Sequence, residues 1–270
     1  MLPEEKKKLL IYVPAFNSGS TISELIERIS MIAASFQKIE LFRMVVIDDG
    51  STDNTLEMLS GLAKEHPFLK ISTLGRNMGP VAALFAGMSK ISAELGRMEN
   101  PEETIILRMD SDLEHQPEDI PVVLGPLLHG NYGVSVGVVP FDERSGPQAR
   151  QFNESTGLSE SRHFLGIDIP QFCPGFFAVR GDLFLKIYPL LKSMAAKFRE
   201  EMGVDMLTMD FAFLFLAKEQ DAKIAVAEVS PIPDLLAKPV PLGKIISYMD
   251  YHQQTLDFLE SWKKSHSSSE

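Results

Sequence analysis

The stretch that decides the fold is Met44-Val45-Val46-Ile47-Asp48-Asp49-Gly50-Ser51-Thr52-Asp53. Its first four residues are apolar and mostly β-branched, which is typical of a buried strand, and the polar residues after them predict a loop. Asp53 is expected to cap a helix, because Leu56, Leu59 and Leu62 follow it on one helical face. The stretch therefore predicts a strand, a loop and a helix, in that order.

The same order of elements recurs through the first half of the chain. We predict further strands over residues 9–13, 69–74 and 104–109, each followed by a polar loop and a helix. Thr21 and Glu24 form a capping-box pattern at the start of the first helix. Strands that alternate with helices are typical of parallel strands joined by right-handed crossovers. We therefore expect an α/β fold with a mostly parallel central sheet that is flanked by helices on both faces.

The second half of the chain is less regular. It contains a long polar connection over residues 141–169, and connections of this length are often functional segments. Predicted strands follow at residues 132–139, 172–179 and 223–229, and predicted helices at residues 182–191, 205–218 and 244–262.

Composition excludes several classes of function. The chain has 26 Lys and Arg against 37 Asp and Glu, a net charge of −11, which removes the broad positive field that non-specific nucleic-acid binding requires. A single cysteine, Cys173, excludes an intrachain disulfide framework and a multi-cysteine zinc site. The sequence has neither an apolar run of about 18 residues nor the pattern of a signal peptide. We expect a soluble cytoplasmic protein without a nucleic-acid partner.

Acidic and amide side chains follow the predicted strands of the first half. They are Asn17, Asp48, Asp49, Asp110 and Asp112. Ligands of such sheets bind beyond the carboxyl ends of the strands, so we expect these side chains at one edge. Asp110 and Asp112 can share a divalent cation, and oxygen ligands suit Mg²⁺ or Mn²⁺. Each motif also has an ordinary alternative, since an isolated acid-x-acid triplet is often a solvated turn and the loop after Asp49 has the composition of a turn and helix cap.

Taken together, five stretches in this order resemble glycosyltransferase family 2, whose members have the GT-A fold, a Rossmann-like arrangement. The stretches are Val13-Pro14-Ala15-Phe16-Asn17, Val46-Ile47-Asp48-Asp49-Gly50-Ser51-Thr52-Asp53, Asn77-Met78-Gly79 with Ala82, Asp110-Ser111-Asp112-Leu113-Glu114-His115, and Pro174-Gly175-Phe176-Phe177 with Arg180. Residues 109–118 and the Gly-Phe stretch are most similar to the polyprenyl-phosphate sugar transferases, the branch of the dolichyl-phosphate mannose synthases.

The resemblance implies a metal-dependent, inverting transfer of a sugar from a nucleoside-diphosphate sugar, UDP- or GDP-linked. The acceptor would be a polyprenyl phosphate, a glycan or another molecule, and Mg²⁺ or Mn²⁺ would be the cofactor. It also implies one catalytic domain over residues 1–235, with a nucleotide-sugar half at 1–116 and an acceptor-side half at 117–235. Residues 236–270 would form a helical extension and tail.

The resemblance also assigns roles to residues. The implied donor site comprises Pro14, Ala15, Phe16, Asn17, Asp49, Asn77 and Asp110. Within it, Phe16 would line the nucleobase, Asp49 would accept a hydrogen bond from the base, and Asp110 would face the ribose or a metal-bound water. Asp112 would bind the metal together with Asp110. Glu114 stands where the branch often has Gln, and it would either add a metal ligand or be an exposed acid in the turn before Pro117.

The implied catalytic residue is Asp210, which falls where many family members have a general base. The family's Glu-Asp pair reads Met209-Asp210 in this chain, so half of the pair is missing. A phosphate acceptor needs no strong base, in which case Asp210 would only position it. A helix cap or a buried acid paired with Lys or Arg is an equally weighted interpretation.

Other residues and functions stay open at this point. His115 is near the implied metal but is interpreted as a hydrogen-bonding surface imidazole. The arginines at 144, 150 and 162 either grip a phosphate or form a solvated face. The family's acid after Asn17 is replaced by Ser18, so the role that the acid would have at that position does not carry over. A nucleotidyltransferase normally has an Arg-containing Gly-rich loop after the first strand, which is missing here. A catalytically silent nucleotide-binding scaffold also remains, as do a soluble acceptor and a peripheral membrane contact through the C-terminal helix.

Overall fold

The computed structural model of the chain describes residues 6–139, 158–169, 174–206, 208–230 and 242–267. A seven-stranded sheet runs through the molecule in the order β3-β2-β1-β4-β6-β5-β7. The strands are β1 (Lys7–Ala15), β2 (Ile39–Asp48), β3 (Leu69–Thr73), β4 (Thr104–Arg108), β5 (Val134–Val138), β6 (Phe177–Arg180) and β7 (Ile224–Glu228). Only β6 runs antiparallel to its neighbours among these strands. The prediction of a mostly parallel α/β sheet is confirmed.

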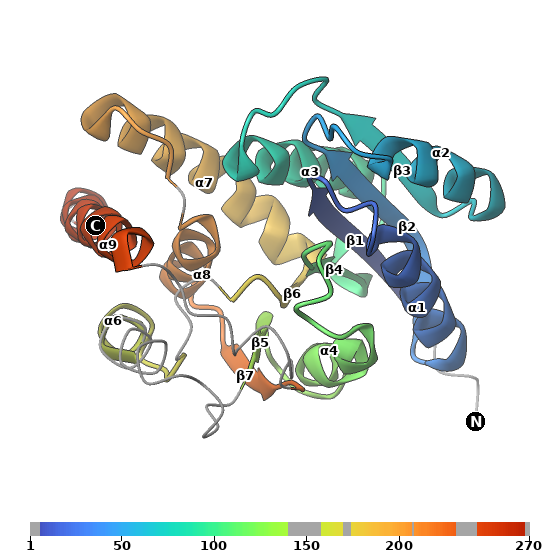
Figure 1. The fold of residues 1–270 in the computed structure, drawn as a ribbon. Coiled ribbons are helices and arrows are strands. Elements are labelled where there is room, and N and C mark those ends of the chain that lie inside the picture. The colour runs from blue at the N-terminus through green and yellow to red at the C-terminus, as the bar shows by residue number, and fades with distance from the viewer. Residues whose placement is uncertain (1–5, 140–157, 170–173, 207, 231–241, 268–270) are drawn as a thin grey trace.

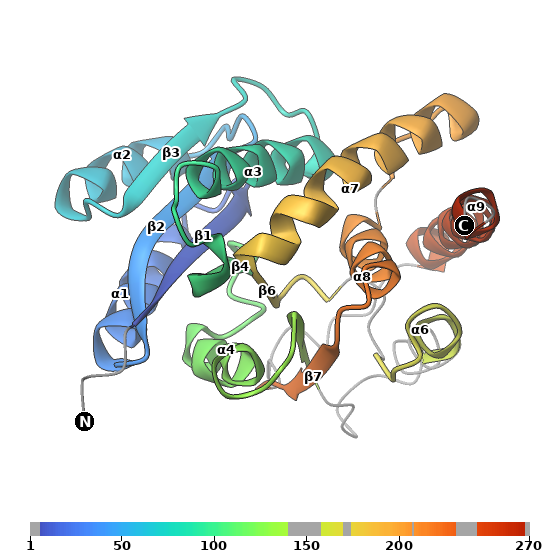
Figure 2. The same cartoon turned by 180° about the vertical axis from the view of Figure 1, so that it is seen from behind.

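Helices cover both faces of this sheet, as Figures 1 and 2 show. One face is covered by α1 (Ile22–Ser35), α2 (Thr55–Glu65) and α4 (Ile120–His129). The other face lies under α3 (Pro80–Leu95), α6 (Leu158–Leu165), α7 (Gly181–Met202), α8 (Met209–Glu219) and α9 (Leu242–Ser267). Short 3₁₀ turns at Pro101–Glu103 and Pro117–Asp119 precede β4 and α4.

The apolar runs of the sequence become strands because both faces of the sheet are buried. In β1, Ile11 and Val13 pack into the layer beneath α1 and α4, whereas Leu10 and Tyr12 pack into the layer beneath α3 and α8. Successive side chains of a strand point to opposite faces, so an unbroken apolar run fills two separate cores.

The reversed direction of β6 brings a distant segment to the acidic edge. Phe177, the first residue of β6, pairs with Arg108, the last residue of β4. The residues just before Phe177 therefore enter the sheet where β4 ends. The sequence predicts a strand in this region but not its direction.

Two expectations about helix starts are wrong. The Thr21 side chain makes no cap to α1, because its Oγ1 donates to the carbonyl of Ser111 at 2.7 Å. Asn54, not Asp53, is the N-cap residue of α2. Asp53 instead accepts hydrogen bonds from the amides of Gly19 and Thr55, each at 3.0 Å. Side chains that the local sequence pattern assigns to helix caps thus form hydrogen bonds with neighbouring loops.

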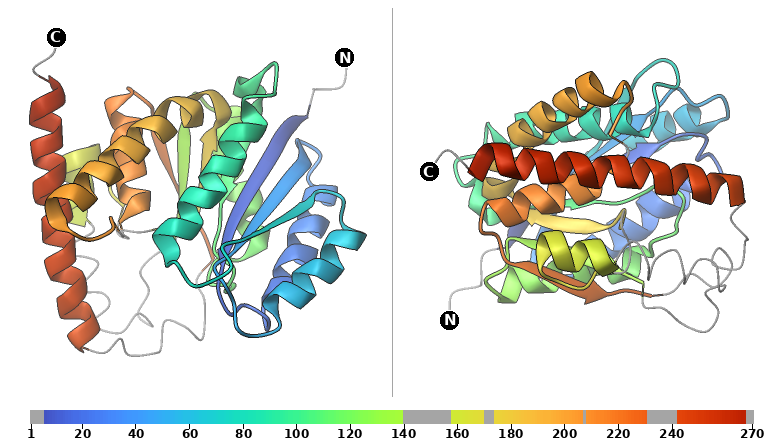
Figure 3. Two further views of the ribbon diagram at one scale, coloured as in Figure 1. Left: turned by 90° about the horizontal axis from the view of Figure 1, so that it is seen from above. Right: turned by 90° about the vertical axis from the view of Figure 1, so that its left-hand side faces the viewer.

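The helix predicted over residues 182–191 continues to Met202, because Met194 and Phe198 extend its buried face. It ends at Gly203, whose φ of 72° is the left-handed conformation that glycine adopts easily. Phe198 in turn contacts Phe258 of α9, with ring centroids 5.1 Å apart. The outermost helix α9 thus adds to the core at the end of the molecule remote from α1 (Figure 3). No helix in the described ranges is both long enough and apolar enough to cross a bilayer.

Candidate active site

Three loops meet at the carboxyl ends of β1, β2 and β4. The Ser18 and Ser111 hydroxyls are hydrogen-bonded, which joins the loop after β1 to the loop after β4. Asn17 has a left-handed φ of 52°, and its Oδ1 accepts from the Thr52 amide at 2.8 Å, which joins the first loop to the loop after β2. The Asp49 amide donates to the carbonyl of Ala15 at 2.8 Å. These bonds gather segments that are far apart in the sequence.

The adjacent acids at the end of β2 are buried and satisfied by donors. Asp48 accepts from the Ser51 amide at 3.1 Å and from the Thr73 hydroxyl at 2.9 Å. Asp49 accepts from the amides of Met78 and Gly79, at 2.7 and 2.9 Å. A carboxylate offers about four lone-pair sites, so Asp49 retains acceptor capacity beyond these two bonds. Through these two hydrogen bonds Asp49 fixes the loop after β3.

A close backbone contact fixes the same loop. Gly50 has a φ of 68°, and a Cβ at this position would lie 2.2 Å from the carbonyl carbon of Arg76. Only glycine lets the two backbones approach this closely. Asn77 is exposed, and its Oδ1 accepts from the Gly79 amide at 3.0 Å. The loops after β2 and β3 therefore form one packed unit.

Two large apolar side chains are left uncovered on these loops. Phe16 is 43% exposed and Met78 is 48% exposed, whereas Ala15 is buried and Pro14 is half-buried. An aromatic ring and a thioether chain at a loop rim are surfaces on which a planar base can pack. The structure thus leaves Phe16 accessible to a ligand.

The acids after β4 differ in their surroundings. Asp110 is half-buried and accepts from Arg108 Nη1 at 2.9 Å. Asp112 and Glu114 are exposed, and Asp112 accepts from the Glu114 amide at 3.0 Å. Partial desolvation raises the pKa of Asp112, and the like charge of Asp110 adds to the rise. These groups offer only oxygen atoms, the ligands that Mg²⁺ and Mn²⁺ prefer.

Asp210 lies at the start of α8 and is 4% exposed. Its Oδ2 accepts from the Gly175 amide at 3.1 Å, and its Oδ1 lies 3.6 Å from Arg108 Nε. Burial raises the pKa of Asp210; Arg108 opposes the rise and Asp110 adds to it. The N-cap residue of α8 is Thr208, so Asp210 does not cap this helix. Of the two structural interpretations, a helix cap or a buried acid paired with Lys or Arg, the second describes its contacts with Arg108.

Sequence reasoning missed Arg108. It is 6% exposed in a fully buried strand, where it follows Ile105, Ile106 and Leu107, and it lies between Asp110 and Asp210. The sequence does contain a signal for this residue, since Arg108 interrupts an apolar run that predicts a buried strand. Arginine is almost never buried without a partner, so a partner carboxylate was to be expected.

The expectation of a surface imidazole at His115 is wrong. The side chain is 8% exposed and its ring lies 5.1 Å, centroid to centroid, from that of Phe176. Burial lowers the pKa of His115, and Asp110 opposes this. The antiparallel entry of β6 covers the histidine, which sequence spacing does not encode.

The remaining candidates lie apart or outside the described residues. Arg162 forms a two-bond pair with Asp168 at 2.6 and 2.9 Å, so its guanidinium fork already has a carboxylate partner. Arg144, Arg150 and Cys173 lie outside the described residues.

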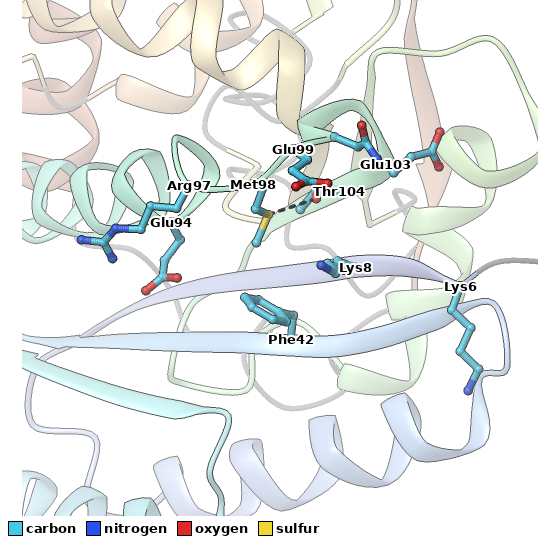
Figure 4. Close-up of a pocket in the computed structure, with 10 residues that line it drawn as sticks. Lys6, Lys8, Phe42, Glu94, Arg97, Met98, Glu99, Glu103 and Thr104 are labelled. Atoms are coloured by element: carbon cyan, nitrogen blue, oxygen red, sulfur yellow. Dashed lines mark hydrogen bonds between the residues drawn. The ribbon is translucent and has the colours of Figure 1, made fainter.

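Two other features lie away from the acidic edge. A hollow of about 440 Å³ opens beside the amino ends of β1 and β4, around Lys8, Phe42 and Met98, with charges of both signs (Figure 4). Glu27, Glu65 and His66 form the one group of three possible metal ligands with atoms within 4.8 Å of one another in the described part of the chain. Asp110, Asp112 and Glu114 do not converge to that spacing.

The family model of glycosyl transferase family 2 matches residues 10–188, which include the three loops and β6. The chain belongs to this family. The resemblance seen in the five sequence stretches is thereby confirmed.

Curated relatives in the family have names from the polyprenyl-phosphate branch. An undecaprenyl-phosphate 4-deoxy-4-formamido-L-arabinose transferase of Serratia proteamaculans is 31% identical over 119 residues, 44% of this chain and 33% of that protein. A dodecaprenyl-phosphate galacturonate synthase of Rhizobium johnstonii is 32% identical over 136 residues, 50% of this chain and 37% of that protein. The similarity thus spans about a third of the length of these relatives.

Solved structures share the fold at low sequence identity. Glucosyl-3-phosphoglycerate synthase of Mycobacterium tuberculosis, in complex with Mn²⁺, UDP and glucosyl-3-phosphoglycerate, has a TM-score of 0.55 at 17% identity, over 94% of this chain and 79% of that one. Mannosyl-3-phosphoglycerate synthase of Rubrobacter xylanophilus has a TM-score of 0.58 at 15% identity, over 97% of this chain and 75% of that one. The GT-A fold predicted for this family member is confirmed.

Proposed function

We propose that this family 2 chain is a divalent-metal-dependent, inverting sugar transferase that moves a sugar from a UDP- or GDP-linked donor to a polyprenyl phosphate. The observation that carries the proposal is the meeting of the loops after β1, β2 and β4, which gathers Asp49, Asp110 and Asp112 at one edge of the sheet. Curated relatives are polyprenyl-phosphate sugar transferases by name, which supports the acceptor class.

The donor side of the proposal rests on the first three loops. The exposed Phe16 would stack on the base, with Pro14, Ala15 and Asn17 shaping the backbone beside it. Asp49 would accept from the base with a lone pair that Met78 and Gly79 do not use. Asn77 is exposed on the loop that Asp49 holds, within the same set of donor residues.

The metal side rests on the acids after β4. The exposed oxygens of Asp112 fit a hard cation, and a bound cation would offset the partial desolvation that raises the pKa of this carboxyl. Asp110 and Glu114 would complete the protein's share of ligands by closing on the ion, because their oxygens and those of Asp112 do not all lie within 4.8 Å of one another in the structure. A bound Mg²⁺ or Mn²⁺ would stabilise the negative charge that develops on a leaving diphosphate. Structures of the same fold have been crystallised with Mn²⁺ or Mg²⁺ and UDP.

The acceptor assigns a modest role to Asp210. A polyprenyl phosphate is already an anionic nucleophile, so attack on the sugar carbon needs no strong base. Asp210 is buried and bonded to Gly175, which suits a group that holds its surroundings in place. We therefore propose that Asp210 acts by position rather than as a base. Displacement from the face opposite the diphosphate inverts the sugar carbon.

A polyprenyl acceptor also requires contact with a bilayer surface, and we propose that this contact is peripheral.

The test combines ligand protection with transfer. A ligand that binds only the native state raises its melting temperature, so UDP or GDP with Mn²⁺ is expected to protect the wild-type chain, and chelation with EDTA to remove the effect. Asp112→Asn should lose the protection, whereas Glu57→Gln, an exposed acid on α2, should keep it.

Transfer is then measured with the matching radiolabelled sugar nucleotide and undecaprenyl phosphate in vesicles. Product with an inverted anomeric carbon is the expected outcome. Protection by neither UDP nor GDP would contradict the proposal. Protection without hydrolysis or transfer would favour the silent scaffold, and nucleotidyl transfer to a sugar phosphate would favour the nucleotidyltransferase.

A further inference from the structure

Arg108 is the one buried guanidinium that lies between the acidic edge and the acceptor-side helices in the described ranges. It closes β4, and β6 and Tyr12 of β1 flank it in the sheet register. Leaving a buried charge without a partner is strongly unfavourable, so the neighbours of Arg108 decide what it does.

The guanidinium is shared between two carboxylates. Arg108 Nη1 donates to Asp110 Oδ2 at 2.9 Å, and Nε lies 3.6 Å from Asp210 Oδ1. At this distance the second contact is an ion pair and not a hydrogen bond. Both Nε and Oδ1 are buried without a hydrogen-bond partner in the described part of the chain. One cation thus faces one carboxylate at the rim and one on α8.

Gly175 closes over this arrangement. Its φ is 63°, and an added Cβ would lie 2.6 Å from Arg108 Nη1 and 2.7 Å from Asp110 Oδ2. The Gly175 amide donates to Asp210 Oδ2 at 3.1 Å. Asp210 therefore holds the turn that covers the pair of Arg108 and Asp110, and the three side chains form one connected unit.

We propose that Arg108 is a positioning residue for the donor and metal site. Its guanidinium holds the Asp110 carboxylate and links it to Asp210 on α8. This inference rests on the proposed function, because Asp110 matters only where a donor and its metal bind. With Oδ2 held by Arg108, Asp110 presents Oδ1 to the rim in one orientation.

Lysine cannot reproduce this geometry. A guanidinium is a planar fork that reaches two carboxylates at once, whereas an ammonium is a point charge on a flexible stem. Loss of an outer-shell partner of a metal ligand typically lowers metal affinity about 10- to 100-fold. Arg108→Lys should therefore keep the buried charge and weaken the site.

The first experiment compares Arg108→Lys with Arg43→Lys in the full chain. Arg43 is a matched control, a half-buried arginine on β2 whose Nε lies 3.9 Å from Glu94, away from the acidic edge. The readout is the Mn²⁺ concentration that gives half-maximal protection by UDP or GDP. We expect an increase of about tenfold or more for Arg108→Lys and no change for Arg43→Lys.

The outcomes separate the two proposals. A protected wild type and an Arg108→Lys variant with the same Mn²⁺ dependence would overturn the role of Arg108 and leave the proposed function intact. A lower melting temperature with unchanged Mn²⁺ dependence would have the same effect, because it assigns Arg108 to stability alone. A wild type that no nucleotide protects would overturn the proposed function, and the role of Arg108 with it.

A second experiment tests the link to Asp210 without any ligand. Arg108→Met removes the cation shared by the half-buried Asp110 and the buried Asp210, and adding Asp210→Asn removes the buried carboxylate. We expect the double variant to unfold at higher urea concentration than Arg108→Met alone, even where the single variant fails to fold. A double variant no more stable than the single one would overturn the link, whatever the nucleotide experiment shows.

Discussion

The hydroxyl oxygens of Ser18 and Ser111 lie 2.7 Å apart, although 93 residues separate them in the sequence. Ser18 follows β1 and Ser111 follows β4, the neighbouring strand. The Thr21 hydroxyl adds a bond to the Ser111 carbonyl at 2.7 Å, so the loop that carries Asn17 is tied to the loop that carries Asp112. The donor and metal parts of the proposed site are therefore mechanically joined.

A double-mutant cycle tests this joint. Ser18→Ala and Ser111→Ala each remove one partner of a buried hydrogen bond, and we expect a coupling free energy of about 0.5–1.5 kcal/mol between them. Urea unfolding of the wild type, both single variants and the double variant measures it. Ser60→Ala on α2, an exposed serine whose hydroxyl donates to the Leu56 carbonyl of the same helix, is the control and should couple to neither. Additive losses at positions 18 and 111 would show that the bond is not formed in solution.

Substitutions of Asp49 should lower the free energy of unfolding by different amounts. Asp49→Ala leaves the amide of Met78 without its acceptor and the amide of Gly79 with Asn77 Oδ1 alone, which should cost about 1–3 kcal/mol in the free energy of unfolding. Asp49→Asn keeps one oxygen and should lose less. Urea unfolding gives the order, and nucleotide protection of both variants reports the donor site. Equal stability of Asp49→Ala and the wild type would contradict the part that this side chain plays in holding the loop.

Asp210 should make stability depend on pH in a defined direction. Burial raises its pKa above the ordinary value of 3.8, so the folded chain binds this proton more tightly than the unfolded chain. The resulting stability is present below the ordinary pKa and is lost as the pH rises through the folded-state pKa. Asp210→Asn cannot titrate, so its stability relative to the wild type should increase with pH in that window. Urea unfolding at a series of pH values measures both curves; parallel curves would contradict the shift.

Gly175→Ala should weaken the site more than a glycine change of equal backbone strain. Gly203 is the matched control, because its φ of 72° is also left-handed and a Cβ there meets nothing within 4 Å. Each substitution carries a left-handed backbone cost of about 1–2 kcal/mol. Only the methyl group at position 175 also displaces the pair of Arg108 and Asp110. Nucleotide protection with Mn²⁺ should therefore fall in Gly175→Ala and persist in Gly203→Ala; equal behaviour would remove the steric argument.

The strands and the acidic edge were predictable because each is encoded locally. An apolar run that stops at Asp48 or at Asp110 marks both the buried strand and the end where ligands bind. Parallel crossovers then place the loops at one edge without any knowledge of distances. The five matching stretches added the family, which the family model confirms.

What could not be predicted depends on partners that are distant in sequence. The direction of β6 brings Gly175 next to Arg108. The sequence of residues 172–179 does not indicate which strand β6 pairs with or in which direction it runs. Burial of His115 follows from the same event. Thr21 has the local pattern of a cap, but the carbonyl of Ser111 takes its hydroxyl. Local pattern identifies an element, and tertiary neighbours decide which atoms its side chains bond.

The alternation of side chains along β1 has a consequence for how the protein tolerates change. Ile11 and Tyr12 are adjacent in the chain but belong to hydrophobic layers on opposite sides of the sheet. Substitutions at distant sites that share no partners generally add their effects on stability. Substitutions that lie far apart in the two layers are therefore expected to add in their effects on the free energy of unfolding. Repacking under α1 is expected to leave the charges of Arg108 and Asp210 undisturbed where it spares Phe176, which belongs to the same layer and adjoins Gly175.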